Sequence, residues 1–503
     1  MVSVPNVLSL IIILVFIFVM LAIGVLMYRK RKAGAEDYFL MSRDIPWWLL
    51  SMTTMGTMIS TFTFLGGVGL GYSLGTSMFF IALSNCWIGI YMITLGHRMW
   101  ILGKKYGYVS LGEILRDRFD NSKFLEIFFG CSSCLWQIAY LAMMYVGCSY
   151  AISTVTGGLI FYKMALLLIV VTTSIYTVVG GMRAVVITDA IQWVLVVITL
   201  VAAIVIIAGV GIPGAGVIQG FRTVATTAPQ VLGKVMADRV WIEMFIFISV
   251  GFFFGPAIWT RMLAARDERA IAWTAANVTF FHPFFMGFVC FLIGIAAWAI
   301  YGPKFPRPDN LLPTIMKGYF PWWLGTVIMA GAVAAAKSVI SACMLSLSQL
   351  ITRDIVEPIY GKLTPRGSDH VSYVALVCLG IVSVVIGWLP PASIIIKSVE
   401  FSNTGLAMIA PVTIAALYWR RATTAGAIAG FVGGTILAAV MRFGGYQTPW
   451  LTGPIWAFIA NAVLIVVVSL LTARTSEATV EKINGYLDAQ IYGNEMKLEA
   501  GRQ

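Results

Sequence analysis

The sequence predicts an all-α polytopic membrane protein, on the evidence of its composition and of the spacing of its apolar segments. Of 503 residues, 59% are hydrophobic and only 11% are charged. A soluble domain cannot bury that much apolar surface, whereas a helical membrane protein exposes it to lipid. The net charge of +12 does not predict nucleic-acid binding, because the charges lie in short loops between apolar segments, as they do in membrane proteins.

Windows of about 20 apolar residues, enough to cross a bilayer as a helix, give thirteen predicted transmembrane helices. They cover residues 6–28, 46–75, 77–101, 124–156, 161–180, 187–212, 240–262, 271–302, 321–351, 371–390, 394–418, 423–443 and 450–472. An odd number places the termini on opposite sides. Most Lys and Arg residues outside the spans fall on the side of Arg29–Lys32, which predicts a plasma-membrane orientation with the N-terminus outside and the C-terminus in the cytoplasm; the family resemblance described below implies that this is the inner membrane of a prokaryotic-type cell.

Two predicted spans contain residues that interrupt a membrane helix. The second span holds hydroxyl residues and a glycine pair between Ser60 and Gly67, and the seventh holds Phe254-Gly255-Pro256. Unwinding a helix frees backbone groups that must then bind an ion, a solute or water. Corresponding interruptions in two halves of a chain indicate an inverted-repeat transporter with its site near the bilayer midplane. Two kinks without function are the alternative, because glycine is common in membrane helices.

The interruptions also predict how the chain is organised. Each opens a run of five helices, so we expect two five-helix inverted repeats with discontinuous first helices. The expected parts are 1–45, the first transmembrane helix and a cytoplasmic loop; 46–212, the first repeat; 240–421, the second repeat; 422–472, two C-terminal transmembrane helices; and 473–503, a cytoplasmic tail.

Four stretches of the sequence resemble the sodium/solute symporter family: Gly180–Gln192, Gly56–Gly71, Ala334–Asp354 and Tyr418–Ala427. The resemblance extends over nearly the whole chain. It implies alternating access by the two repeats and the import of a small organic solute such as a monocarboxylate, an amino acid or a vitamin acid. The first interruption looks closer to the pantothenate and monocarboxylate branches than to the sugar branch.

The resemblance implies a principal sodium site between the first interrupted helix and the ninth span. By position, its ligands would be the carbonyls of Gly56, Ile59 and Ala335 and hydroxyls at 338 and 339. Ser338 is present, but residue 339 is valine. Since a hard cation of this kind needs about six oxygen ligands, the site is degenerate.

A second sodium position, found in some family members, is also incomplete by the same resemblance. It would use Asp189, Ser338, Ser341 and a hydroxyl at residue 342, which is alanine here. Both implied sodium sites therefore lack one hydroxyl each.

Lys337 lies midway along the ninth span, next to these incomplete sites. A lysine at that depth costs several kcal/mol and faces a partner or a water-filled cavity. On a helix, Lys337 and Ser341 share a face, and the resemblance places Ser341 near Asp189. Our hypothesis is that the Lys337 ammonium replaces a sodium ion, so that transport is coupled to protons or to no ion.

Two alternatives to this hypothesis stay open. The hypothesis expects the Lys337 ammonium to pair with the Asp189 carboxylate and to form a coupling centre with Ser341. Instead, Lys337 could point away from the site and reach a helix end or an aqueous vestibule. A conventional sodium-coupled symporter is the other, in which Gly56, Ile59, Ala335 and Ser338 bind sodium and a water molecule completes the site.

The solute is expected beside the two interruptions, where freed backbone and small polar side chains meet. The candidate residues are Ser60, Thr63, Asn85, Gln137, Phe254, Gly255, Trp259 and Asn403. Hydrogen bonding between helices is an alternative role for each polar residue among them. None of these positions is an arginine, so a salt bridge to a carboxylate cannot be assumed.

Other classes of function fit the sequence less well. The three histidines, His97, His282 and His370, are far apart and no catalytic or metal-ligand spacing accompanies them, so we expect neither an enzyme nor a bound cofactor. A membrane sensor would need a separate partner protein, and a channel would show a polar ring pattern. The expected partners are the solute, the lipid bilayer and sodium or a proton, in a monomer or weak homodimer that binds no nucleic acid.

Overall fold

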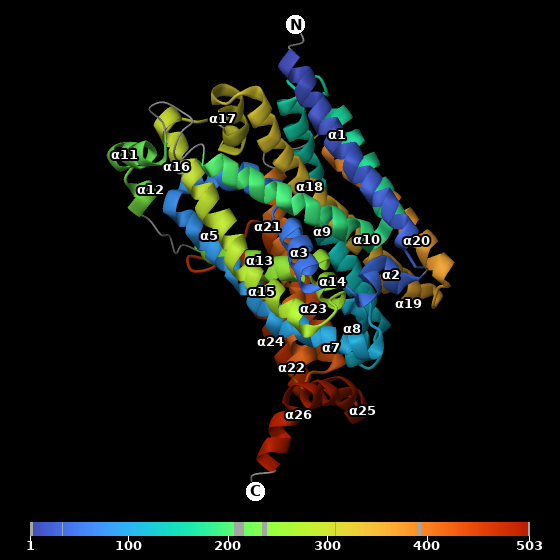
Figure 1. The fold of residues 1–503 in the computed structure, drawn as a ribbon. Helices are drawn as coiled ribbons and strands as arrows, with labels where there is room; N and C mark the ends of the chain where they lie inside the picture. Colours follow the sequence, from blue (N-terminus) through green and yellow to red (C-terminus); the bar gives the residue numbers. More distant parts are fainter. Residues whose placement is uncertain are drawn as a thin grey trace.

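The computed structural model describes residues 4–32, 34–205, 216–233, 239–306, 308–389 and 394–500, and within these ranges it contains helices but no β-strand (Figure 1). The N-terminal half contains α1 (Val4–Leu26), α2 (Ala35–Leu40), α3 (Trp47–Met58), α4 (Val68–Leu74), α5 (Met78–Ser84), α6 (Cys86–Tyr91), α7 (His97–Tyr106), α8 (Leu111–Arg118), α9 (Lys123–Val155), α10 (Tyr162–Val205), α11 (Val217–Thr227) and α12 (Gln230–Gly233).

The C-terminal half contains α13 (Arg239–Phe254), α14 (Pro256–Leu263), α15 (Glu268–Pro283), α16 (Cys290–Tyr301), α17 (Leu311–Tyr319), α18 (Trp322–Leu350), α19 (Glu357–Tyr360), α20 (Pro365–Gly387), α21 (Ile394–Ala407), α22 (Ile409–Tyr418), α23 (Thr424–Phe443), α24 (Gly453–Leu471), α25 (Glu477–Val480) and α26 (Tyr486–Ala500). Five π-helical turns join neighbouring helices: Phe62–Gly67, Met92–Gly96, Phe284–Val289, Ile351–Val356 and Glu481–Gly485.

Ten helical segments in the described part of the chain are long and apolar enough to cross a membrane, or eleven if one bent pair is counted as a span. The predicted number of thirteen is not confirmed by this count. Two of the segments, Phe62–Tyr106 with 45 residues and Tyr162–Ile204 with 43, are about twice as long as one crossing requires. Gly181, which has a φ of +54°, kinks the second of them.

Both predicted helix interruptions are confirmed. Helix α3 ends at Met58, and Ile59 is extended, with φ −87° and ψ 111°. Helix α13 stops before Gly255, whose ψ is 125°, and the axes of Trp241–Phe254 and Pro256–Leu263 differ by 47°. The inverted-repeat relation between the two halves stays a prediction.

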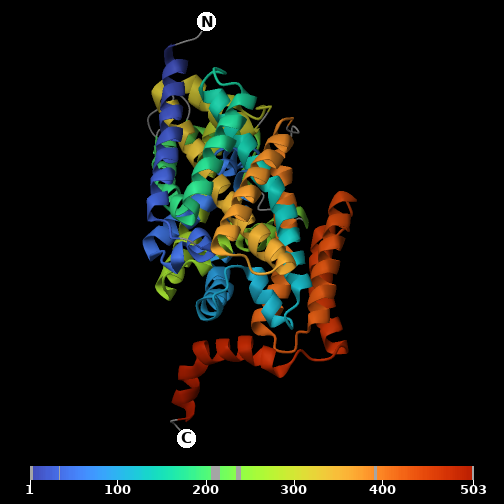
Figure 2. The same cartoon turned by 90° about the vertical axis from the view of Figure 1, so that its right-hand side faces the viewer.

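Helix α18 forms the centre of the bundle and packs against α9, α10, α3 and α14. Its residues from Ile328 to Leu350 are all buried, including Lys337. Helices α23 and α24 pack on each other at the edge of the bundle (Figure 2). The close approach depends on Gly430 and Gly434, because a Cβ at either would lie within 2.4 Å of a side-chain atom of α24.

The C-terminal segment after α24 lies across the end of the bundle opposite the N-terminus (Figure 2). Asn484 donates a hydrogen bond to the Ala416 carbonyl over 3.1 Å, and the Lys482 ammonium lies 2.7 Å from Asp117. Below, the end of the bundle that carries the N-terminus is called the N-side and the opposite end the C-side.

Candidate ion and solute site

A fully buried ion pair joins the C-side halves of the two interrupted helices to α10. Arg261 on α14 donates to the Asp189 carboxylate on α10 over 2.8 Å, and the two side chains are 1% and 0% exposed. Thr53 on α3 donates to the same carboxylate oxygen over 2.8 Å and accepts from Arg261 over 3.1 Å. Sequence reasoning treated Arg261 as the end of a span and missed this pair.

The expected ion pair between Lys337 and Asp189 is not formed. The Lys337 ammonium lies 3.4 Å from the Thr172 hydroxyl and 5.4 Å from the centre of the Tyr176 ring, both on the first half of α10. The reason is geometric: Lys337 faces the part of α10 before the Gly181 kink, whereas Asp189 lies after that kink.

Lys337 is nevertheless enclosed, as the cost of a charge in the bilayer requires. Its side chain is 0% exposed, and no carboxylate pairs with it among the described residues. One long hydrogen bond and one aromatic face are its direct contacts, with the Cys148 side chain of α9 nearby. Lys337 thus points away from Asp189, as one of the two alternatives expects, but it is enclosed by the bundle.

Part of the implied sodium site is assembled around Gly56. A Cβ placed on Gly56 would lie 3.0 Å from the Ser338 hydroxyl and 3.1 Å from the Asp189 carbonyl. The Ser338 hydroxyl lies beside the Asp189 carboxylate, and neither this hydroxyl nor the carboxylate oxygen Oδ1 forms a hydrogen bond of ordinary geometry. Ile59 and Ala335 are buried on the two facing helices.

Ser341 does not complete this group. Its hydroxyl donates to the backbone carbonyl of Ser338 over 3.0 Å. Residues 339 and 342, valine and alanine, add no side-chain oxygen. Of the expected positions, Gly56 and Ser338 thus lie close together, with fewer side-chain oxygens than a hard cation prefers.

A small pocket lies between the two interrupted helices, and some of the predicted solute-binding residues line it. The pocket is nearly closed in this structure, with a cavity volume of about 30 Å³, enough for about one water molecule. It is lined by Thr57, Gln137, Tyr140, Gly251, Phe252, Gly255, Ala257, Ile258, Val339, Cys343, Ser402, Asn403 and Leu406. Three of the eight predicted residues, Gln137, Gly255 and Asn403, therefore line it.

The other five predicted residues lie in the bundle but do not line this pocket. Asn85 donates to the Ile81 carbonyl over 3.2 Å, and the carbonyl of Thr63 accepts from the Cys290 thiol over 3.3 Å. The rings of Phe254 and Trp259 pack inside the bundle. Ser60, at the first interruption, lies close to the Tyr140 hydroxyl at the edge of the pocket.

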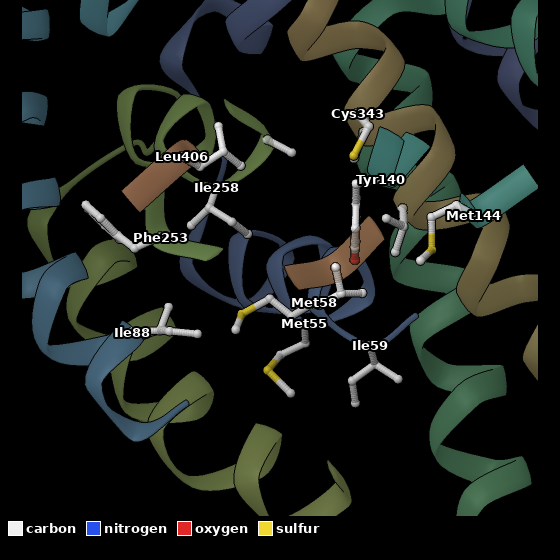
Figure 3. Packing of buried hydrophobic residues seen from close by; sticks show 14 of the residues in the cluster. Met55, Met58, Ile59, Ile88, Tyr140, Met144, Phe253, Ile258, Cys343 and Leu406 are labelled. Carbon is white, nitrogen blue, oxygen red and sulfur yellow. The ribbon is translucent and has the colours of Figure 1, made fainter. Parts of the chain in front are cut away.

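Several pocket residues were missed, although a simple signal could have found two of them. Tyr140 follows Gln137 by three residues on α9, and Cys343 follows Val339 by four on α18. Residues at those spacings share a helix face. Figure 3 shows Tyr140 and Cys343 on one side of the space beside the first interruption and Ile258 and Leu406 on another.

Helix α18 separates the pocket from Lys337, because successive residues turn by about 100°. Val339 and Cys343 line the pocket, Ser338 faces Gly56, and Lys337 contacts Thr172 on α10. One rigid helix thus carries the solute wall on one face and the buried lysine on the other.

A protein-family model described as the sodium:solute symporter family matches residues 38–434. The chain belongs to the sodium:solute symporter family. It is therefore a membrane-embedded secondary active transporter of solutes, and the resemblance seen in the sequence is confirmed. The exact solute and the ion that drives its transport are not given by family membership.

The relatives agree with this assignment. The chain is 27% identical over 443 residues to a sodium/pantothenate symporter of Escherichia coli, covering 85% of this chain and 89% of the relative. It is 25% identical over 496 residues to a sodium/proline symporter of Staphylococcus aureus, covering 92% and 93%.

Two solved structures share the fold. One is a Na⁺-coupled sialic acid symporter in a substrate-bound, outward-open state, with a TM-score of 0.80, 21% identity and coverage of 95% of this chain and 100% of that chain. The other is a transporter of the nucleobase-cation-symport-1 family in a closed conformation, with a TM-score of 0.58, 12% identity and coverage of 90% and 98%.

Proposed function

We propose that this family member imports a small organic solute without sodium, and that the protonated Lys337 supplies the positive charge that sodium supplies in its relatives. Coupling is then to protons, which Lys337 takes up and releases during the transport cycle. Two observations carry the proposal: Lys337, next to Ser338 of the implied sodium site, is fully buried and lies on Thr172 rather than on a carboxylate, and Asp189 is already paired with Arg261.

The ion pair disfavours a further cation. Asp189 is already neutralised by Arg261 at 2.8 Å, so a protonated Lys337 leaves the site with one surplus positive charge. Adding sodium would raise that surplus to two in a medium of low dielectric, where charges repel strongly.

The setting of Lys337 suits a proton carrier. Its ammonium has one hydroxyl at 3.4 Å and the face of Tyr176, but no carboxylate. Burying such an ammonium is costly, and releasing the proton removes that cost. If access to Lys337 alternates between the two sides of the membrane, the proton can be taken up from one side and released to the other.

A conventional sodium symporter is the second candidate, and one observation favours it. The Ser338 hydroxyl and Asp189 Oδ1 are buried close together, and neither forms a hydrogen bond of ordinary geometry. Two such oxygens and a water molecule could contribute to a sodium site. The sodium coupling of the relatives supports the same candidate.

The test compares wild type and Lys337→Gln in a thermal-stability screen of the purified protein against organic acids, amino acids, sugars and vitamins. Each solute is tested in sodium and in choline buffer at two pH values, because a ligand that binds the native state raises its stability. We expect a stabilising solute whose effect depends on pH but not on sodium, and loss of the pH dependence in Lys337→Gln. Stabilisation that requires sodium in wild type would contradict the proposal.

Lys163 provides the matched control, because its ammonium also lies against an aromatic ring, 4.6 Å from the centre of Trp388. Lys163→Gln removes a lysine of the same kind outside the site. It should leave the pH dependence of solute binding unchanged.

A further inference from the structure

A groove on the surface of the bundle runs along the C-side half of the first interrupted helix. It lies where α3 packs against both α10 and α15, and its volume is about 330 Å³, which is within the range of pockets that hold small molecules. Its lining residues are Trp47, Trp48, Ser51, Met52, Met55, Trp193, Val197, Asn277, Phe281 and Phe285.

The groove lies in a surface that faces lipid. Exposed apolar side chains adjoin its lining residues on both neighbouring helices: Ile198 on α10 and Phe280 on α15 are 56% and 66% exposed. A membrane protein presents such side chains to the hydrocarbon of the bilayer. The medium that fills a hollow in this surface is therefore the acyl chains of lipids rather than water.

The two polar side chains of the lining are already paired. Asn277 donates to the Ser51 hydroxyl over 3.1 Å, and the hydroxyls of Ser51 and Thr274 lie 3.2 Å apart. The other eight lining residues are tryptophan, methionine, valine and phenylalanine, and no described lining residue carries a charge. This surface suits a hydrocarbon chain and does not suit a polar solute.

The C-side end of the groove carries the groups that mark the headgroup level of a bilayer. Trp47 and Trp48 are about half exposed, and the ring centres of Trp47 and Trp273 are 5.8 Å apart. Tryptophan is enriched at this level. Arg269, one helical turn before Trp273 on α15, is exposed and has no ion pair or hydrogen bond within the described part of the chain. A guanidinium pairs readily with phosphate oxygens.

We propose that this protein holds one phospholipid of the bilayer as a bound ligand, with an acyl chain in the groove between α3, α10 and α15 and its phosphate at Arg269. The apolar lining recognises the chain, and the basic side chain beyond the tryptophans recognises the headgroup. The inference goes beyond the proposed function, since it concerns neither the solute nor the coupling ion.

The lipid contacts the same half-helix that carries part of the candidate ion site. Met52 and Met55 of α3 line the groove, whereas Thr53 of α3 donates to the Asp189 carboxylate inside the bundle over 2.8 Å. A lipid chain in the groove therefore supports α3 from outside and opposes displacement of this half-helix. Lipid binding should accordingly raise the thermal stability of the protein.

The test is native mass spectrometry of the purified full-length protein, titrated in detergent with palmitoyl-oleoyl phosphatidylglycerol. We expect a first phospholipid that binds more tightly than those that follow, and a thermal midpoint that rises as this first lipid binds. Inorganic phosphate should neither bind nor stabilise. A titration without a distinct first lipid, or phosphate that binds as well as the phospholipid, would overturn the inference.

Val197→Trp tests whether the tight lipid lies in the groove, because a larger side chain on α10 fills it from the lipid side. This variant should lose the tightly bound phospholipid. Val201→Trp is the matched control, since Val201 lies one turn further along α10, is also exposed and does not line the groove; it should bind lipid as wild type does.

Arg269→Gln tests the headgroup contact at an exposed position where folding is not at risk. It should weaken binding of the first lipid about fivefold, the factor expected for one basic residue near a membrane surface. Arg269→Lys keeps the charge and should bind nearly as wild type does. Unchanged lipid binding in both Val197→Trp and Arg269→Gln, or equal loss in Val201→Trp, would overturn the inference.

None of these measurements contains the solute or depends on sodium. Their outcome is therefore separate from that of the proposed coupling, and either proposal can fail while the other stands.

Discussion

The two interrupted helices differ in what surrounds them. The first interruption, after Met58, approaches the charged residues: a Cβ on Gly56 would lie 3.0 Å from Ser338 and 3.1 Å from the Asp189 backbone. The second interruption, at Gly255, lines the solute pocket together with Gly251, Phe252, Ala257 and Ile258. Thr57, next to Gly56, also lines that pocket. Both interrupted helices therefore reach the pocket, and the first also lies beside Ser338 and Asp189.

The two regions are still joined. Arg261, on the C-side half of the second interrupted helix, pairs with Asp189 and with Thr53 of the first. Helix α18 lies between the regions, with Val339 facing the pocket and Lys337 facing α10. A movement of either interrupted helix therefore changes both regions, which is what coupled transport requires.

The largest expected effect comes from breaking the ion pair between Arg261 and Asp189, which joins the two regions. Arg261→Gln leaves Asp189 buried without a cation, which costs about 3–5 kcal/mol, so we expect loss of transport and a marked fall in thermal stability. The double variant Arg261→Gln with Asp189→Asn removes both charges and should recover most of the stability. Arg266→Gln, whose ion pair with Asp44 is exposed, is the control. Equal stability of the single variant and wild type would contradict the account.

Two glycine substitutions are expected to affect the two regions differently. A Cβ on Gly251 would lie 2.6 Å from the Asn403 backbone, so Gly251→Ala must displace α21, at a cost of about 1–3 kcal/mol, and should weaken solute binding. Gly56→Ala is the milder change and should alter the pH dependence of binding more than its affinity. Binding titrations at several pH values distinguish the two. The same phenotype for both variants would show that the regions are not separate.

The comparison is sharpened by rebuilding the sodium site. The triple variant Lys337→Met, Val339→Thr and Ala342→Ser removes the extra charge and restores both missing hydroxyls. Solute binding by this protein should become dependent on sodium, whereas wild type should be indifferent to it. Thermal stabilisation by the solute in sodium and choline buffers measures the change, and a triple variant that ignores sodium would count against the charge argument.

The smallest effect is expected at the ion pair between Asp37 and Arg183, which belongs to neither region. Burial alone would raise the pKa of Asp37, but hydrogen bonds from Arg183, Ser42 and the Lys32 amide lower it below its usual 3.8. A carboxylate with a depressed pKa stabilises the fold above the pKa of the unfolded state, and this contribution is lost as the pH falls through the lower, folded value.

Asp37→Asn should therefore reduce stability near neutral pH by about 1–3 kcal/mol and leave less difference from wild type below pH 3.8. Thermal midpoints across pH measure this. Solute selectivity and sodium dependence should stay as in wild type. Asp44→Asn, at an exposed ion pair, should have a smaller effect on the midpoint.

The sequence predicted the membrane class, the family and both helix interruptions, because these depend on local signals. Gly255-Pro256 and the hydroxyl and glycine run after Ile59 disfavour a continuous helix wherever they occur. The predicted number of thirteen spans is not confirmed, since Phe62–Tyr106 and Tyr162–Ile204 each form one long helical segment.

The pairing of buried charges could not be predicted from the sequence. Helical periodicity puts Lys337 and Ser341 on one face of the helix. It does not predict which part of α10 lies opposite that face. The kink at Gly181 decides this, placing Thr172 beside Lys337 and Asp189 beside Arg261. Arg261 itself resembles an ordinary basic residue at the end of a span until α3 and α10 are packed around it.

The most direct test of the central claim is equilibrium binding of sodium-22 to the purified wild-type protein, since it needs no knowledge of the solute. The account predicts no saturable binding to wild type and saturable binding to the variant with Lys337→Met, Val339→Thr and Ala342→Ser. Saturable sodium binding to wild type would contradict it, and would make this chain a conventional sodium symporter with Lys337 beside an occupied site.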